Sequence, residues 1–211
     1  MSKEEVMGKI IGITGGIASG KSTVTNFLRR EGYKVVDADT LVHKLQNPGE
    51  RLYRILVEHF GQEIILENGS LNRPLLAKRL FSNPSELEWS KETQGEVIRE
   101  ELATLRDQLA QTEGVFFMDI PLLFEQGYDS WFDEIWLVYV DKKTQIERLM
   151  NRDHMNVEEA QARLESQWSL SKKKKLASHI IDNSGTQKEL VEQVASLLEG
   201  GVSYSTDFLE G

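Results

Sequence analysis

A glycine-rich loop between a predicted strand and a predicted helix carries the clearest chemical signal. Residues 9–25 read KIIGITGGIASGKSTVT, and Gly15, Gly20, Lys21 and Ser22 have the spacing of a phosphate-binding loop, G-x-x-x-x-G-K-S. Glycines let a backbone turn tightly against a polyphosphate, and N–H groups of the loop and the following helix point toward negative charge. The alternative is a glycine turn that merely precedes a helix. The apolar strand before the loop and the amphipathic helix after it favour phosphate binding.

The loop side chains have separate predicted roles. Lys21 is placed to reach the β- and γ-phosphates of a nucleoside triphosphate, and Ser22 to offer its hydroxyl to Mg²⁺. We expect the nucleotide to contact the following loop residues: Gly15, Gly16, Ala18, Ser19, Gly20, Lys21, Ser22 and Thr23.

Two carboxylates follow a short predicted strand at 33–36, in the order Asp37-Ala38-Asp39. A kinase needs a carboxylate near its acceptor hydroxyl, to orient it and to take its proton. Asp39 also has the position of an N-cap, because a helix is predicted over 40–46. Beside a phosphate-binding loop we favour the chemical role for Asp39. Asp37 is assigned to supporting Mg²⁺ or the loop.

A third carboxylate, Asp119, ends the apolar run VFFMD at 115–119. A carboxylate at that place holds the metal in many nucleotide-binding proteins. A strand-end aspartate bonded to a loop is the alternative, and the sequence leaves both open.

Two arginines lie four residues apart on a predicted helix, so Arg148 and Arg152 share one face. Phosphoryl transfer spreads negative charge over the transferred group, which arginines can clamp. The alternative is a solvated helix face beside Glu147. We expect both arginines to contact nucleotide, with Arg148 favoured. The lysine run 172–175 is interpreted as solvated surface.

The remaining pattern predicts elements that would bring these groups together. Apolar runs predict buried strands at 115–119 and 135–140 and a short strand at 180–182, with helical patterns between them. Such alternation indicates an α/β fold with a doubly wound parallel sheet, whose ligands sit at the carboxyl ends of the strands. We expect one domain over 1–200, with a helical insertion at 61–113, a helical lid at 142–176 and a flexible tail at 201–211.

Composition narrows the class of protein. The 211 residues carry a net charge of −9, which argues against general nucleic-acid binding. The absence of cysteine excludes disulfides, zinc–thiolate sites and thiol nucleophiles. The sequence shows neither a signal peptide nor an apolar run of about 20 residues, so we expect a cytoplasmic protein without membrane partners. It leaves the oligomeric state open.

Eight segments, in this order, resemble the dephospho-coenzyme A kinases. They are ITGGIASGKSTV at 13–24, VVDAD at 35–39, NPG at 47–49, HFG at 59–61, NRPLLAKRLFSNP at 72–84, DIPLLFE at 119–125, QIERLMNRD at 145–153 and IIDNSG at 180–185.

The resemblance implies a three-layer P-loop kinase core, a helical acceptor-binding region and a lid. It implies transfer of the γ-phosphate of ATP, with Mg²⁺, to the ribose 3′-hydroxyl of dephospho-coenzyme A, the last step of coenzyme A biosynthesis. The family's base maps onto Asp39 and its lid arginine onto Arg148. One departure is Gly95-Glu96, where the family usually carries His-Pro in a long helix.

Other nucleotide-binding proteins remain as alternatives. Shikimate-type kinases also pair a phosphate-binding loop with Asp-x-Asp, but this sequence lacks their later Gly-Gly-Arg element. It lacks the Gly-x-Pro-Arg element of adenylate kinases and the Asn-Lys-x-Asp motif of GTPases as well.

Overall fold

The computed structural model describes residues 7–201. The tail predicted at 201–211 therefore lies, after its first residue, outside the described residues. The chain divides into two compact units, which are described separately. The first unit, here called the core unit, comprises Met1–Val36 and Ala110–Gly211. The second, here called the helical unit, comprises Asp37–Leu109.

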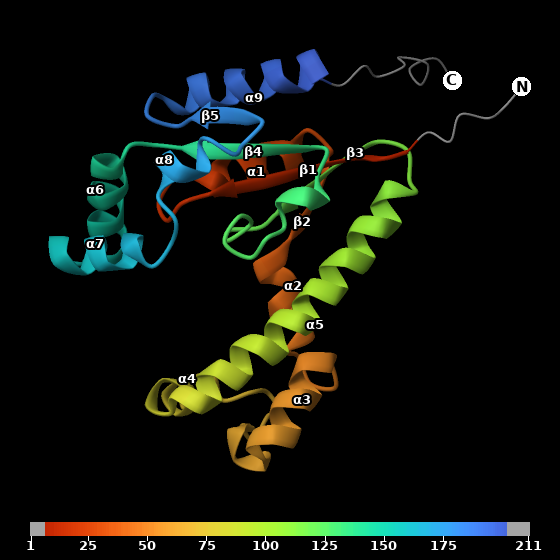
Figure 1. The fold of residues 1–211 in the computed structure, drawn as a ribbon, viewed down its shortest axis with the longest axis vertical. Helices are drawn as coiled ribbons and strands as arrows, with labels where there is room; N and C mark the ends of the chain where they lie inside the picture. The colour runs from red at the N-terminus through yellow and green to blue at the C-terminus, as the bar shows by residue number, and fades with distance from the viewer. Residues whose placement is uncertain (1–6, 202–211) are drawn as a thin grey trace, which may run out of the picture. The chain divides into compact units, whose positions relative to one another are not determined.

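The core unit is built on a five-stranded sheet (Figure 1). Its strands, in the spatial order β2-β3-β1-β4-β5, are β1 (Lys9–Gly15), β2 (Lys34–Asp37), β3 (Val115–Asp119), β4 (Glu134–Tyr139) and β5 (His179–Asp182). β1 pairs in parallel with β3 and β4, and β4 pairs in parallel with β5. The predicted α/β fold with a parallel sheet is confirmed.

Both faces of the central strand, β1, are packed against apolar side chains, as expected for a strand covered on both sides. Ile11 and Ile13 are fully buried on one face. Gly12 points to the other face, where an added Cβ would lie 2.7 Å from Cδ2 of Phe132. A glycine is therefore required there by the close approach of the 120–132 segment.

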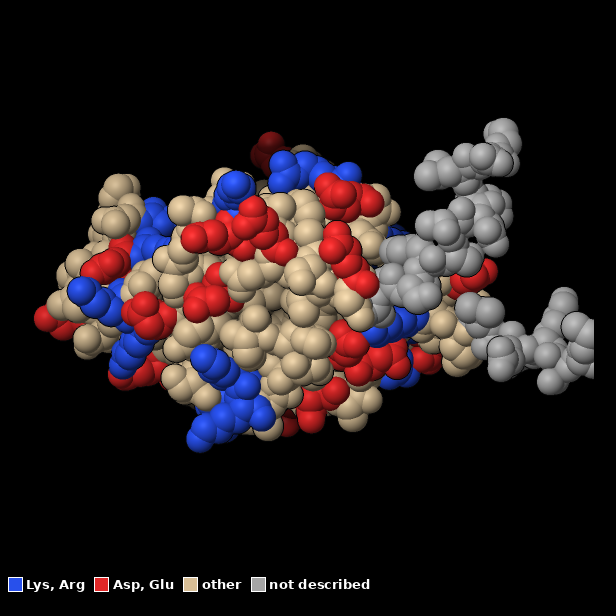
Figure 2. Space-filling view, turned by 90° about the horizontal axis from the view of Figure 1, so that it is seen from above, with Lys and Arg blue, Asp and Glu red and all other residues tan. Residues whose placement is uncertain are grey.

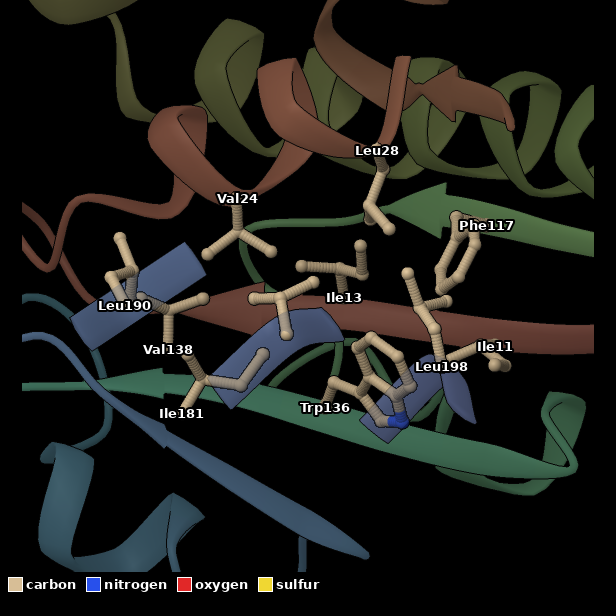
Figure 3. Close-up of a cluster of buried hydrophobic side chains, with 11 residues drawn as sticks. Ile11, Ile13, Val24, Leu28, Phe117, Trp136, Val138, Ile181, Leu190 and Leu198 are labelled. Atoms are coloured by element: carbon tan, nitrogen blue, oxygen red, sulfur yellow. The ribbon is translucent and has the colours of Figure 1, made fainter. Parts of the chain in front are cut away.

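Helices cover the sheet on both faces. α1 (Lys21–Arg30) and α9 (Gln187–Gly201) pack on the face shown in Figure 3. The buried cluster there contains Ile11, Ile13, Val24, Leu28, Phe117, Trp136, Val138, Ile181, Leu190, Val194 and Leu198. On the opposite face, Leu170 packs against Leu137 and Val140. Leu170 belongs to α8 (Leu170–Lys173), which follows α6 (Lys142–Asp153) and α7 (Val157–Glu165).

The helical unit contains four α-helices: α2 (Ala38–Leu45), α3 (Arg51–Phe60), α4 (Arg73–Ser82) and the long α5 (Pro84–Ala110), which ends just beyond it. Leu56, Phe60 and Ile64 form one of its buried clusters, and Leu45, Leu52 and Val97 another. The unit thus includes α2 and α3, which precede the insertion predicted at 61–113.

The surface mixes charges of both signs. Asp and Glu side chains are scattered among Lys and Arg over the face in Figure 2. Within residues 7–201, no helix combines the length and the apolar character needed to cross a membrane.

Candidate active site

The loop that joins β1 to α1 adopts two left-handed backbone conformations. Gly20 has φ of 86° and Ala18 has φ of 59°, a value that residues with a side chain rarely adopt. The N–H of Ser19 donates to the carbonyl of Gly16 at 3.1 Å and closes a turn. The backbone is thereby folded back on itself just before the first N–H groups of α1.

Two glycines of the loop have close neighbours at the place where a side chain would begin. A Cβ added at Gly16 would lie 2.6 Å from Nε2 of Gln145. A Cβ added at Gly20 would lie 2.0 Å from Nδ2 of Asn183, in addition to the strain of its positive φ. Side chains from distant parts of the chain therefore pack directly on the loop backbone.

The loop lysine pairs with the carboxylate that ends β3. Nζ of Lys21 donates to Oδ1 of Asp119 in an ion pair whose carboxylate side chain is only 5% exposed. The strand register explains the pairing, because Asp119 lies opposite Ile13, two residues before the loop begins. Phosphate oxygens bound at the loop would compete with Asp119 for the same ammonium group.

The N–H groups in the first turn of α1 carry the partial positive charge of the helix dipole, and no acidic side chain in this turn competes with an anion for them. This turn contains no acidic residue, and Ser22 within it is exposed. The described residues hold no group of three or more His, Cys, Asp or Glu that could bind a metal by themselves. Mg²⁺ commonly takes one or two protein oxygens together with phosphates and waters, so the Ser22 hydroxyl fits as a ligand for a nucleotide-bound Mg²⁺.

Asn183, just after β5, joins the loop to an arginine. Its Nδ2 donates to the carbonyl of Ser19 at 2.8 Å, and its own carbonyl accepts from Nη2 of Arg148 at 2.9 Å. Nη1 of Arg148 lies 3.8 Å from the Cβ position built on Gly20. The structure therefore places Arg148 beside the phosphate-binding loop.

The second predicted arginine has another partner. Nε of Arg152 donates to Oδ1 of Asp153 at 2.7 Å, and Arg163 reaches the other oxygen of Asp153 at 3.1 Å. The hydrogen bond from Arg152, aided by both positive charges, holds the pKa of Asp153 below its usual range. Arg148 and Arg152 thus share a helix but have different surroundings.

Gln145 is a loop partner that the sequence pattern did not single out. Its side chain is buried, and its Nε2 donates to the carbonyl of Ile17 at 2.7 Å. Gln145 lies one turn before Leu149, which is fully buried on the same helix. The position of Gln145 on the apolar face of α6 could have identified it from the sequence as a buried residue.

The interpretation of 172–175 as solvated surface is wrong for Lys173, which is fully buried. Its Nζ lies 3.2 Å from the carbonyl of Gly15 and 2.9 Å from Oε1 of Glu125. Residues three apart on a helix share a face, and Leu170 is buried. The helical spacing from Leu170 could have separated Lys173 from the exposed lysines around it.

The helical unit begins with Asp37, which is the last residue of β2, and Asp39 follows within α2. α2 begins at Ala38, and Asp37 is its N-cap, with Oδ1 accepting from the N–H of Thr40 at 2.8 Å. Asp39 lies in the first turn and is exposed. Capping as the explanation of Asp39 is therefore wrong, and its carboxylate is accessible to solvent or a ligand.

Comparison with known proteins decides the family. The family model described as dephospho-CoA kinase matches residues 9–189. The chain belongs to the dephospho-CoA kinase family. The predicted family and the prediction that this chain is a kinase are both confirmed.

Several relatives of this family match over nearly their whole length. A dephospho-CoA kinase of Streptococcus pneumoniae is 70% identical over 195 residues, which cover 92% of this chain and 97% of the relative. One from Streptococcus agalactiae is 54% identical over 193 residues, 92% of this chain and 99% of the relative. The structure of a dephospho-CoA kinase from Campylobacter jejuni matches with a TM-score of 0.72 at 26% identity, over 93% of this chain and 100% of that one.

A more distant structure supports the fold alone. Shikimate kinase from Acinetobacter baumannii matches with a TM-score of 0.51 at 16% identity, over 94% of this chain and 97% of that one. This likeness shows that the two chains share a fold.

Gly95-Glu96, the pair predicted from the sequence to depart from the family pattern, lies within α5. A Cβ added at Gly95 would meet nothing within 4 Å, so packing does not require a glycine there. Next to it, the side chain of Gln94 accepts from Gln46 at 3.1 Å, and Gln46 in turn accepts from Arg73. These polar side chains join the residue that follows α2 to α4 and α5, beside the open position.

Proposed function

We propose that this protein transfers the γ-phosphate of ATP to the ribose 3′-hydroxyl of dephospho-CoA and so forms coenzyme A. The observation that carries the proposal is the 70% identity, over 92% of this chain, to a relative named dephospho-CoA kinase. The loop geometry supports it, because the groups that gather on the loop are those that phosphoryl transfer needs.

In the core unit, we assign the binding of the phosphates to the loop. Its N–H groups and the start of α1 would surround the phosphates, and Lys21 would exchange Asp119 for phosphate oxygens. Arg148, beside Gly20, is assigned to stabilising the charge that develops on the transferred group. Arg152 is assigned a weaker contact with the nucleotide.

Mg²⁺ is proposed as the metal that the nucleotide brings. When bound, it would neutralise charge on the phosphate oxygens. The exposed hydroxyl of Ser22 would hold it. Asp37 is assigned only an indirect support of the metal or the loop, since its Oδ1 caps α2.

Asp39 is proposed as the group that orients the acceptor hydroxyl and removes its proton. It is exposed in the first turn of α2, directly after the carboxyl end of β2, where α/β sheets bind their ligands. A base must come within about 2.6–3.2 Å of the hydroxyl whose proton it takes. An exposed carboxylate that makes no helix cap can approach a substrate in this way.

We assign acceptor binding to the helical segment 61–113 and the role of a lid to 142–176. Dephospho-CoA is a large acceptor, and binding energy from its remote parts can position the reacting hydroxyl. The helical unit offers the polar group of Gln46, Arg73 and Gln94 for such contacts. The net charge of −9 argues against a nucleic-acid partner. We also propose a cytoplasmic location and no membrane partner.

The test is turnover with Mg·ATP and a panel of acceptors, read by mass spectrometry. We expect dephospho-CoA to gain one phosphate at its ribose 3′-hydroxyl, with adenosine and AMP far poorer. Product treated with a 3′-specific phosphatase should return to the starting mass. Equal rates with AMP or shikimate, or a phosphate at another position, would overturn the proposal.

A further inference from the structure

A buried lysine contacts the backbone where the phosphate-binding loop begins. The side chain of Lys173, from α8, has no exposed surface. Its Nζ donates to the carbonyls of Gly15 at 3.2 Å and of Pro121 at 3.3 Å, and it pairs with Oε1 of Glu125 at 2.9 Å. We propose that Lys173, held by Glu125, is a positioning residue for the phosphate-binding loop.

The three contacts account for the burial of this charge. A buried ammonium group is strongly unfavourable unless it is paired and hydrogen-bonded. Lys173 has three N–H donors and three acceptor groups, one of them a carboxylate. Its ammonium group is therefore saturated by the protein itself, so Lys173 acts through the backbone that it holds and not on the substrate.

The contact with Gly15 sets the direction of a loop N–H. Gly15 is the last residue of β1, and its carbonyl shares a planar peptide unit with the N–H of Gly16. Fixing the carbonyl oxygen of Gly15 therefore fixes the N–H of Gly16 on the opposite side of the same plane. That N–H is one of the loop groups proposed to bind phosphate.

The contact with Pro121 ties the loop to the neighbouring strand. Pro121 follows Asp119, the end of β3, by two residues, and its carbonyl also accepts from Oγ1 of Thr14 at 3.0 Å. One ammonium group thus bridges the carboxyl ends of β1 and β3. The ion pair between Lys21 and Asp119 also starts from the end of β3, and it reaches the first residue of α1, just after the loop.

Glu125 connects this bridge to the segment 142–176. Its Oε1 also accepts from the N–H of Trp168, at 3.0 Å, in the turn before α8. Its Oε2 is buried and has no hydrogen-bond partner among the described residues. A carboxylate left half satisfied is a poor source of stability, which points to placing Lys173 and Trp168 as its role.

The inference rests on the proposed phosphate-binding role of the loop. Its test is the variant Lys173→Met, which keeps an apolar chain of similar length, with Lys175→Met as the matched exposed control from the same run. We expect the KM and Kd for ATP to rise about tenfold, the equivalent of one misplaced hydrogen bond, with the KM for dephospho-CoA nearly unchanged. A purely structural lysine would lower only the folded fraction, and so kcat, without changing either constant for ATP.

The double variant Lys173→Met/Glu125→Gln separates positioning from the burial of charge. It removes both charges, so we expect its Tm to recover toward that of the unaltered protein while ATP binding stays weak. This variant also serves as the test if Lys173→Met alone does not fold. Recovery of ATP binding in the double variant, or unchanged ATP constants in Lys173→Met, would overturn the inference.

Calorimetric titration with ATP in the absence of acceptor keeps this inference distinct from the proposed reaction. If the unaltered protein binds ATP but phosphorylates no dephospho-CoA, the reaction is refuted and the variants still test Lys173. If it turns over normally and Lys173→Met binds ATP equally well, Lys173 is refuted and the reaction stands.

Discussion

The side-chain amide of Asn183 donates a 2.8 Å hydrogen bond to the main-chain carbonyl of Ser19, which joins the end of β5 to the phosphate-binding loop. The main-chain carbonyl of Asn183 accepts a 2.9 Å hydrogen bond from Arg148. A single residue thus contacts both the loop and the arginine assigned to the transferred phosphoryl group. Displacing Asn183 should affect both.

We expect Asn183→Ala to weaken ATP binding and to lower kcat. The buried carbonyl of Ser19 would lose its donor, which costs about 1–3 kcal/mol in the free energy of unfolding. Ser184→Ala, at the exposed neighbouring residue, is the matched control. Steady-state kinetics and urea denaturation measure the two effects. An Asn183→Ala variant with the kinetics of Ser184→Ala would show that the loop is placed without this bond.

A second prediction concerns the loop lysine. Lys21→Ala should abolish turnover, because no other loop side chain is assigned to the β- and γ-phosphates. It should also lower Tm, because the nearly buried carboxylate of Asp119 loses a cationic partner. In Lys21→Ala/Asp119→Asn, Tm should recover and turnover should not.

The exposed Lys34→Ala is the control for Lys21 and should match the unaltered protein. Thermal denaturation and the mass-spectrometric assay give both readings. Near-normal turnover of Lys21→Ala would refute the phosphate-binding role of the loop.

The two arginines of α6 provide a matched pair. Arg148→Ala should reduce kcat/KM by about 10²–10³-fold, the scale for one donor that stabilises transition-state charge. Arg152→Ala should lose far less, because its guanidinium pairs with Asp153. ATP Kd should change less than kcat in Arg148→Ala. If the two variants lose activity equally, the contact of Arg148 with Asn183 has no bearing on the transferred phosphate.

Much of the core unit could be predicted because buried parallel strands read as continuous apolar runs. The run VFFMD predicts 115–119, and β3 spans Val115–Asp119. The loop motif placed Lys21 at the start of a helix, where α1 begins. These signals are local, so a single sequence carries them.

The contacts that complete the site could not be predicted in this way. Asn183 meets the carbonyl of Ser19 across 164 positions, and Gln145 meets that of Ile17 across 128. Their partners are main-chain carbonyls, which every residue has, so residue types alone do not reveal the pairing. Lys173 is a different case, because its helical spacing from the buried Leu170 distinguishes it from the exposed lysines beside it.

The ion pair at the other end of the sheet provides a prediction about pH. Oε1 of Glu134 pairs with Nζ of Lys9 at 2.6 Å, and its Oε2 accepts from Nε1 of Trp136 at 3.1 Å. Burial disfavours the charged carboxylate, but the hydrogen bonds from Lys9 and Trp136 outweigh it and hold the pKa of Glu134 below its usual range.

Because this pKa is lower in the folded state, the ionised form of Glu134 stabilises the fold above the ordinary glutamate pKa of about 4.3. The contribution is lost as pH falls through the lower folded value. Glu134→Gln should therefore be less stable than the unaltered protein near neutral pH, and the difference should shrink below about pH 4.3. Urea denaturation over a pH series measures it, with the exposed Glu31→Gln as control. A difference that is independent of pH would contradict the assignment.

Asp37, the last residue of β2, and Asp39 should differ in what their loss removes. Asp37 caps α2, whereas Asp39 is exposed in the first turn and makes no cap. Asp39→Asn keeps the shape of the side chain but removes the base. We expect kcat to fall by roughly 10²–10⁴-fold, with the Kd for ATP little changed.

Asp37→Asn is the control for the same substitution two residues away. Asparagine caps helices as well as aspartate does, so stability should be retained and kcat should fall much less. Asp37→Ala removes the cap and should lower the free energy of unfolding by about 0.5–2 kcal/mol. If Asp37→Asn loses kcat while Asp39→Asn keeps it, the base is Asp37. If both keep it, neither carboxylate takes the proton, and the acceptor hydroxyl must be deprotonated by another group or only after transfer has begun.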